Sequence, residues 1–126
     1  AAPKKLMALG RHVALQEQAY HAHLAEQQAT DDAFAEFGVA TEQEEFEFEV
    51  MTVWREFTPI LPLFDYVVLT RNPYSGTVMG IDWVAIDILL HRVDISVTPD
   101  DFANFRVAIT GYANAINEHL AASANQ

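Results

Sequence analysis

Histidine and carboxylate side chains near the start of the chain have spacings that could support metal chemistry. Glu17 and His21 stand four residues apart, so on a helix they share one face and could hold a metal ion or form an ion pair. His21 and His23 are two residues apart and would point about 200° away from each other on a helix, which excludes a shared metal. The sequence contains no His-Glu-x-x-His motif. We therefore expect a solvated polar face here and no metal site, with a small metal-dependent enzyme as the weakest alternative.

A dense run of carboxylates follows between residues 42 and 56. A buried pair of acids with separated pKa values could perform general acid and base catalysis. Acids spread along one surface more commonly form a solvated face, and less commonly a docking surface for a basic partner. The solvated face is our expectation. The run consists of Glu42, Glu44, Glu45, Glu47, Glu49 and Glu56.

The sequence lacks the familiar nucleophile and phosphate-binding motifs. It has no Gly-x-Ser-x-Gly motif, and Ser75 could use His91 as a base only if the fold brought the two together. Gly76 and Gly80 are followed by Ile-Asp rather than by Lys-Ser or Lys-Thr, so they do not form a P-loop. The absence of cysteine removes thiol nucleophiles, disulfides, Cys-ligated zinc and iron–sulfur clusters. We expect a protein that is not an enzyme and that uses no cofactor.

Length and charge narrow the class of protein further. The 126 residues, 51% of them hydrophobic, correspond to one domain over residues 1–126 with a substantial core. Eighteen acidic residues against seven basic ones give a net charge of −11, which would repel nucleic acid and anionic membrane surfaces. No apolar run reaches 18 residues, and the N-terminus shows no signal-peptide core. The lack of a signal-peptide core and of cysteine together favour a location in the reducing cytoplasm.

Apolar residues recurring at spacings of three and four predict an all-α fold of five or six helices. The first helix is expected from Leu6 to Gln28, followed by a short helix through Phe34 and Phe37 that Gly38 stops. We expect residues 1–5 and 121–126 to be disordered.

The second half of the chain carries three further helix signals. Pro59 and Pro62, with Thr58 as N-cap, mark the start of an apolar helix over Leu61–Thr70, and another helix is expected over Ile81–Val93. Thr98 and the Pro-Asp-Asp that follows it are an N-cap and first turn, opening a helix with a heptad-like apolar stripe. Gly111 interrupts this stripe at a position suited to a close helix crossing.

The stretch between Glu42 and Phe57 fits two patterns. Thr41 and Glu44 have the spacing of a capping box, and apolar residues from Phe46 to Phe57 follow a helical stripe. Phe residues that alternate with Glu over residues 45–49 are typical of a strand instead. We expect a helix, which leaves Phe48 partly exposed, with a short β-hairpin near residues 44–52 as the alternative.

From residue 64 to 118, the order of features resembles tail assembly chaperones of long-tailed (siphovirus-type) bacteriophages. The residues that carry this resemblance are the apolar run Phe64-Asp-Tyr-Val-Val-Leu-Thr70, a polar loop, the segment Gly80-Ile-Asp-Trp83 and a final amphipathic helix. Related proteins have a Gly-Leu-Asp-Tyr-like segment at the start of the corresponding helix. They also carry a Trp-Arg pair ahead of the loop, where this chain has Thr70-Arg71; its own Trp54-Arg55 lies earlier.

This resemblance implies a mostly helical protein without enzymatic activity that self-associates during phage tail assembly. Such proteins are thought to coat the tape-measure protein and recruit tail-tube subunits in the cytoplasm of the infected host, and the mature virion is expected to lack them. The apolar loop and the stretch before it then supply candidate residues for partner contact or self-association. These are Phe48, Trp54, Tyr74, Val78, Met79 and Trp83.

A different acidic interaction protein remains the alternative function. It could be another phage structural or connector subunit, or an inhibitor that mimics nucleic acid. The mimic needs negative charge on one surface, which the run from Glu42 to Glu49 would supply.

Overall fold

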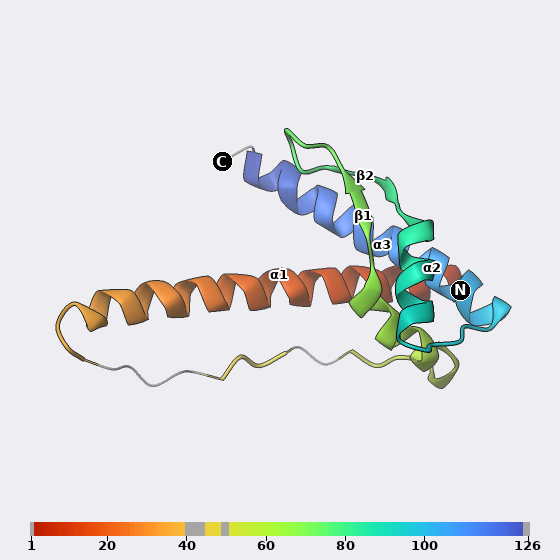
Figure 1. Cartoon of the computed structure of the whole chain (residues 1–126), viewed down its shortest axis with the longest axis horizontal. Coiled ribbons are helices and arrows are strands. Elements are labelled where there is room, and N and C mark those ends of the chain that lie inside the picture. The colour runs from red at the N-terminus through yellow and green to blue at the C-terminus, as the bar shows by residue number, and fades with distance from the viewer. Residues whose placement is uncertain (1, 40–44, 49–50, 125–126) are drawn as a thin grey trace.

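The computed structural model describes residues 2–39, 45–48 and 51–124 of the chain. Over these residues the protein is mainly helical, as predicted, but it has four helices rather than five or six, together with one two-stranded sheet. The elements are α1 (Ala2–Ala35), the 3₁₀-helix η1 (Arg55–Tyr66), β1 (Leu69–Arg71), β2 (Val78–Ile81), α2 (Trp83–Arg92) and α3 (Pro99–Ala124) (Figure 1).

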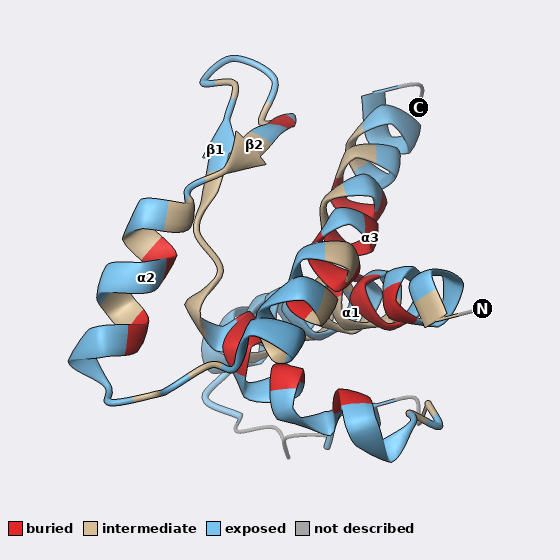
Figure 2. Cartoon of the chain, turned by 90° about the vertical axis from the view of Figure 1, so that its right-hand side faces the viewer, coloured by how far each residue is buried: buried red, intermediate tan, exposed pale blue. Residues whose placement is uncertain are grey.

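The core forms where α1 crosses α3 and where η1 packs against α3. Figure 2 shows buried residues gathered at this crossing. In α1 the buried residues all lie between Leu6 and Ala14, whereas in α3 they extend from Phe105 to Ile116. The largest fully buried side chains are Phe105, Ile60 and Ile109.

Two glycines let the backbones of α1 and α3 touch. A Cβ atom on Gly10 would lie 1.7 Å from the carbonyl oxygen of Ala108, and one on Gly111 would lie 2.0 Å from that of Met7. Both distances are far below any van der Waals contact, so no other residue fits while the helices keep this spacing. The close crossing predicted at Gly111 is confirmed, and the glycine inside α1 has the same explanation.

The helix predicted over Glu42–Phe57 is wrong for all its described residues before Arg55. Residues 45–48 and 51–54 are neither helical nor paired as strands, and the capping-box residues Thr41 and Glu44 lie outside the described residues. The 3₁₀-helix η1 begins at Arg55 instead. Thr58 does not cap a helix; its hydroxyl donates a hydrogen bond to the Arg55 carbonyl at 2.7 Å.

A three-residue repeat explains why η1 is a 3₁₀-helix. A 3₁₀-helix has three residues per turn, so side chains three apart stack on one face. Phe57, Ile60 and Leu63 have this spacing, and all three are buried. Pro59 and Pro62 share another face and lack the N–H that an α-helix would use there. The α-helix predicted over Leu61–Thr70 is therefore wrong as well.

A hairpin forms at residues 69–81, whereas residues 45–48 and 51–52, the described part of the stretch given as the alternative, contain no strand. β1 pairs antiparallel with β2, with Leu69 opposite Ile81 and Thr70 opposite Gly80. Asn72 shapes the connecting loop, because its side-chain oxygen accepts hydrogen bonds from the N–H groups of Tyr74 and Ser75 at 2.8 and 3.2 Å.

Each of the last two α-helices begins at a side-chain cap, and the cap at Thr98 was predicted from the sequence. Asp82 accepts a hydrogen bond from the Ala85 N–H at 3.0 Å, and Thr98 accepts one from the Asp101 N–H at 3.1 Å. At the termini the expectation of disorder is wrong for residues 2–5 and 121–124, which belong to α1 and α3.

The outer half of α1 projects away from the rest of the molecule (Figure 1). The two helices expected over Leu6–Gln28 and around Phe34 are one continuous helix, which ends at Ala35. The turn that follows it contains Gly38, whose φ is 70°. From residue 15 to 35 no residue of α1 is buried. We call residues 18–39, with the segment 45–48 that returns beside them, the arm. The remaining described residues are the head.

Candidate interaction surface

Glu17, where the arm leaves the head, has a structural partner. The Tyr112 hydroxyl of α3 donates a hydrogen bond to the Glu17 carboxylate at 2.5 Å. Burial raises the pKa of the Tyr112 phenol well above its ordinary value, and the hydrogen bond to Glu17 raises it further. Within the described residues, no three His, Asp or Glu side chains gather as a metal site would require. The pair of Glu17 and His21 thus gains no third ligand among them.

The raised pKa of Tyr112 predicts that the free energy of unfolding falls at alkaline pH. Its pKa is raised in the folded state, so the folded protein keeps a proton that the unfolded chain releases near pH 10. The resulting stabilisation is complete below about pH 10 and is lost as the pH rises above it. We expect Tyr112→Phe to flatten the fall in unfolding free energy above about pH 10, measured by urea denaturation at several pH values. Equal slopes in both proteins would contradict this account.

The other catalytic possibility, a pairing of Ser75 with His91, finds no support in their hydrogen bonds. The Ser75 hydroxyl donates to Thr77 Oγ1 at 2.9 Å in the hairpin loop. His91 Nδ1 lies 2.8 Å from the Asp87 carbonyl oxygen and 3.4 Å from its carboxylate. Each side chain is thus engaged by its own neighbours.

The predicted contact residues of the hairpin divide between surface and core. Tyr74 at the hairpin tip is 97% exposed and Met79 is 68% exposed. Val78 is buried, so its prediction as a surface residue is wrong: side chains alternate along a strand, and Val78 faces inward where Met79 faces outward. The Val78 backbone also bonds to Asn117 of α3, donating to its Oδ1 at 2.7 Å and accepting from its Nδ2 at 3.2 Å.

The remaining predicted residues lie in three separate places. Phe48 belongs to the arm, where its ring centroid is 5.6 Å from that of Tyr20. Trp54 stacks on Phe57 in the head, and the ammonium of Lys5 lies 4.5 Å from its ring centroid. Trp83 is half-buried beside Phe102, with their ring centroids 5.4 Å apart. The six residues therefore do not form one patch.

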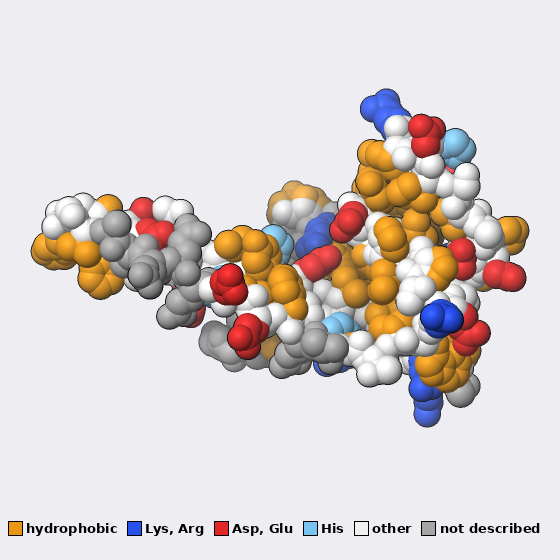
Figure 3. Space-filling view, turned by 90° about the horizontal axis from the view of Figure 1, so that it is seen from below, with side chains coloured by type: hydrophobic (Ala, Val, Ile, Leu, Met, Phe, Trp, Pro, Cys, Tyr) orange, Lys and Arg blue, Asp and Glu red, His pale blue; other side chains and the backbone are white. Residues whose placement is uncertain are grey.

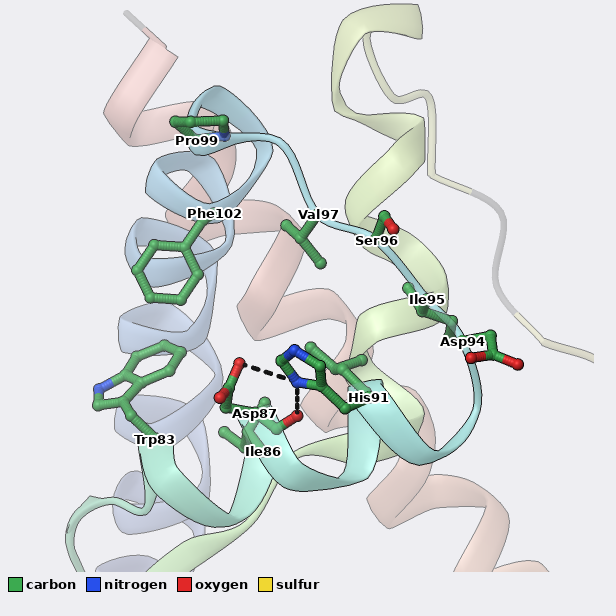
Figure 4. Close-up of a pocket in the computed structure, with 11 residues that line it drawn as sticks. Trp83, Ile86, Asp87, His91, Asp94, Ile95, Ser96, Val97, Pro99 and Phe102 are labelled. Carbon is green, nitrogen blue, oxygen red and sulfur yellow. Dashed lines mark hydrogen bonds and ion pairs between the residues drawn. The ribbon is translucent and has the colours of Figure 1, made fainter.

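Trp83 lines a pocket of about 750 Å³ between α2 and the start of α3. Figure 4 shows Trp83 and Phe102 together on one side of it, with Val97 and Ile95 on the connection between the helices. Its polar lining residues are Asp87, His91, Asp94 and Ser96, and no Lys or Arg is among them. The sequence patterns did not predict this pocket, because the chain from residue 94 to 97 carries no helix or strand signal.

The arm exposes large apolar side chains, several of them at positions predicted to lie on helices. Phe37 is 80% exposed, and several others are more than a third exposed. Phe46 contacts one side of α1, with ring centroids 5.5 Å from Tyr20 and 5.3 Å from His23. Beside it lies a shallow groove of about 260 Å³. The exposed apolar residues of the arm are Tyr20, Leu24, Phe34, Phe37, Val39 and Phe48.

The arm is also acidic without compensation. Between Arg11 and Arg55 the sequence has ten Asp or Glu residues and no Lys or Arg. All seven basic residues thus belong to the head. Figure 3 shows this division on one face, where the projecting end has orange and red atoms but no blue ones. A search of the sequence for stretches without Lys or Arg could have found this asymmetry of charge. Only the fold shows that the stretch without Lys or Arg includes the arm.

Comparisons with known protein families, with curated proteins and with solved structures found no match. In the described part of the chain, no helix is long and apolar enough to cross a membrane.

Proposed function

We propose that this protein is a tail assembly chaperone of a long-tailed bacteriophage: a non-enzymatic, self-associating protein that binds the tape-measure protein in the infected host cell. The observation that carries the proposal is the arm, a helix that leaves the head and exposes large apolar side chains along it. Apolar patches of this kind mark protein-binding surfaces. The motif that underlies the resemblance gives local support, because Asp82 of Gly80-Ile-Asp-Trp83 caps α2.

The two parts of the molecule suit different tasks in such a protein. The arm offers about 27 Å of helix beyond the head, an elongated surface for an elongated helical client. The head carries the exposed Tyr74 and Met79 on the hairpin, together with the pocket that Trp83 lines. These are our candidates for contact between copies, and repeated copies along one client would add avidity.

Light scattering coupled to size-exclusion chromatography tests self-association first. We expect the measured mass to rise above the 14.1 kDa of one chain as the concentration increases. Tyr74→Ser with Met79→Ser should shift this rise to higher concentration. The second step is co-expression with the tape-measure protein from the same genome, which should become more soluble and co-purify. A strict monomer that leaves the tape-measure protein insoluble would overturn the proposal, and would favour a different acidic interaction protein.

A further inference from the structure

One stripe of residues runs the whole length of α1. Its members recur at alternating spacings of four and three, which keeps them on one side of the helix with a slow drift. The first half of the stripe is covered by α3: Leu6 and Val13 belong to the core cluster, Gly10 meets the Ala108 backbone, and Glu17 accepts the bond from Tyr112.

Among the described residues, no helix packs against the second half of the same stripe. In Figure 1, α3 diverges from α1 beyond the crossing, while α1 continues. The stripe continues through Tyr20, Leu24, Gln27, Asp31 and Phe34, none of which is buried. The groove beside Phe46 is lined by the first four of these. The helix-packing face that α3 covers in the head therefore continues along the arm with no described helix covering it, and there the rings of Phe46 and Phe48 contact Tyr20.

We propose that this face of the arm binds a basic amphipathic helix of a partner protein. The apolar residues of the stripe are anchors at helical spacing, as in helix-in-groove recognition. Asp31 lies within the stripe, where its carboxylate accepts a bond from Gln27 Nε2 at 3.0 Å. Asp32 and Glu36 are exposed nearby, and Glu45 and Glu47 are exposed on the return segment. A Lys or Arg flanking the partner's apolar face would pair with these acids.

The charge of the arm argues against a second copy as the occupant. Two arms laid side by side would bring their carboxylates together, and neither arm has a Lys or Arg to offset the repulsion. This binding site rests on the proposed function, which supplies the client protein. It adds that the segment of the client that binds the arm is a basic amphipathic helix.

The test uses the full chain and a designed dye-labelled peptide of about four heptads, with Leu at the core positions and Lys beside them. A matched peptide has Gln in place of each Lys. Fluorescence anisotropy should show tighter binding of the Lys peptide, weakening as salt is added. Equal affinity of the two peptides would overturn the charge argument, and no binding of either would overturn the site.

Paired variants locate the binding. Leu24→Ser with Phe34→Ser should weaken Lys-peptide binding by about tenfold or more, whereas Val84→Ser with Ile88→Ser, two exposed apolar residues of the head, should change it less than about twofold. The triple variant Asp31→Asn, Asp32→Asn and Glu36→Gln should weaken binding more than Glu56→Gln, Asp65→Asn and Asp94→Asn, which removes the same charge from the head. Circular dichroism confirms that each variant is folded.

Three further results would overturn the inference. Equal losses in arm and head variants would show general attraction to an acidic protein. Loss of self-association in the Leu24 and Phe34 variant would show that a second copy occupies the face. Unchanged tape-measure binding by the arm variants would refute this client site while leaving the proposed function intact. Conversely, this protein could bind the peptide on its arm but neither self-associate nor bind the tape-measure protein. That result would refute only the proposed function.

Discussion

Gly10→Ala and Gly111→Ala should each lower the free energy of unfolding by about 3 kcal/mol, despite the higher helix propensity of alanine. The new methyl group would lie 1.7 Å from the Ala108 carbonyl oxygen or 2.0 Å from that of Met7. A carbonyl on a packed helix cannot rotate away as a flexible side chain can. The whole helix must shift, which loosens the core along the crossing. Propensity alone would stabilise each variant by about 1 kcal/mol, so the sign of the change separates the two effects.

Gly80→Ala is the matched control for this experiment. A Cβ atom at Gly80 would meet nothing within 4 Å, so this variant should unfold within about 0.5 kcal/mol of the parent protein. Urea denaturation followed by circular dichroism measures all three variants. A parent-like midpoint for Gly10→Ala and Gly111→Ala would show that the helices cross at a greater distance than the structure gives.

The crossing also shows what local sequence patterns can predict. The cap at Thr98 and the stop at Gly38 depend on a few neighbouring residues, and both were predicted. Gly111 was recognised as a place for close approach, but its partner Gly10 is 101 positions away, and no local pattern links the two.

The secondary-structure predictions were wrong where the spacing of apolar residues fits more than one kind of element. Phe57, Ile60 and Leu63 fit a three-residue repeat, yet in a short window such residues also match a helix of 3.6 residues per turn. The hairpin strands are only three and four residues long, too short for their alternation to stand out. β1 begins at the end of an apolar run, so its first residue, Leu69, also fits the helix predicted over Leu61–Thr70.

The candidate surface was only partly predictable for a different reason. Tyr74 and Met79 were predicted as contact residues because a loop rarely carries such side chains, and both are exposed. Leu24 and Phe34 were assigned to packed helices, since apolar residues at helical spacing normally face a core. Whether a helix face is covered depends on where a distant element ends. Here α3 diverges from α1, which the periodicity of α1 cannot reveal.

Phe105→Ala should cause the second large loss, about 3–5 kcal/mol of unfolding free energy. Phe105 is among the three largest fully buried side chains. Its ring stacks on Phe64 of η1 with centroids 5.3 Å apart, and it meets the edge of Trp83 of α2 at 6.1 Å. Removing it leaves a cavity where three elements meet, so η1 and α2 should loosen together. Urea denaturation gives the size of the loss, and near-UV circular dichroism reports the packing around Trp83.

Phe102→Ala is the control on the same helix. Phe102 also contacts Trp83, but its side chain is 42% exposed, so its truncation leaves no closed cavity and should cost less than about 1.5 kcal/mol. Similar losses in the two variants would mean that the contact with Trp83, rather than burial at the junction, dominates. A cost below about 1 kcal/mol for Phe105→Ala would instead place η1 and α2 outside the cooperative core. The head would then not be the rigid base from which the arm projects.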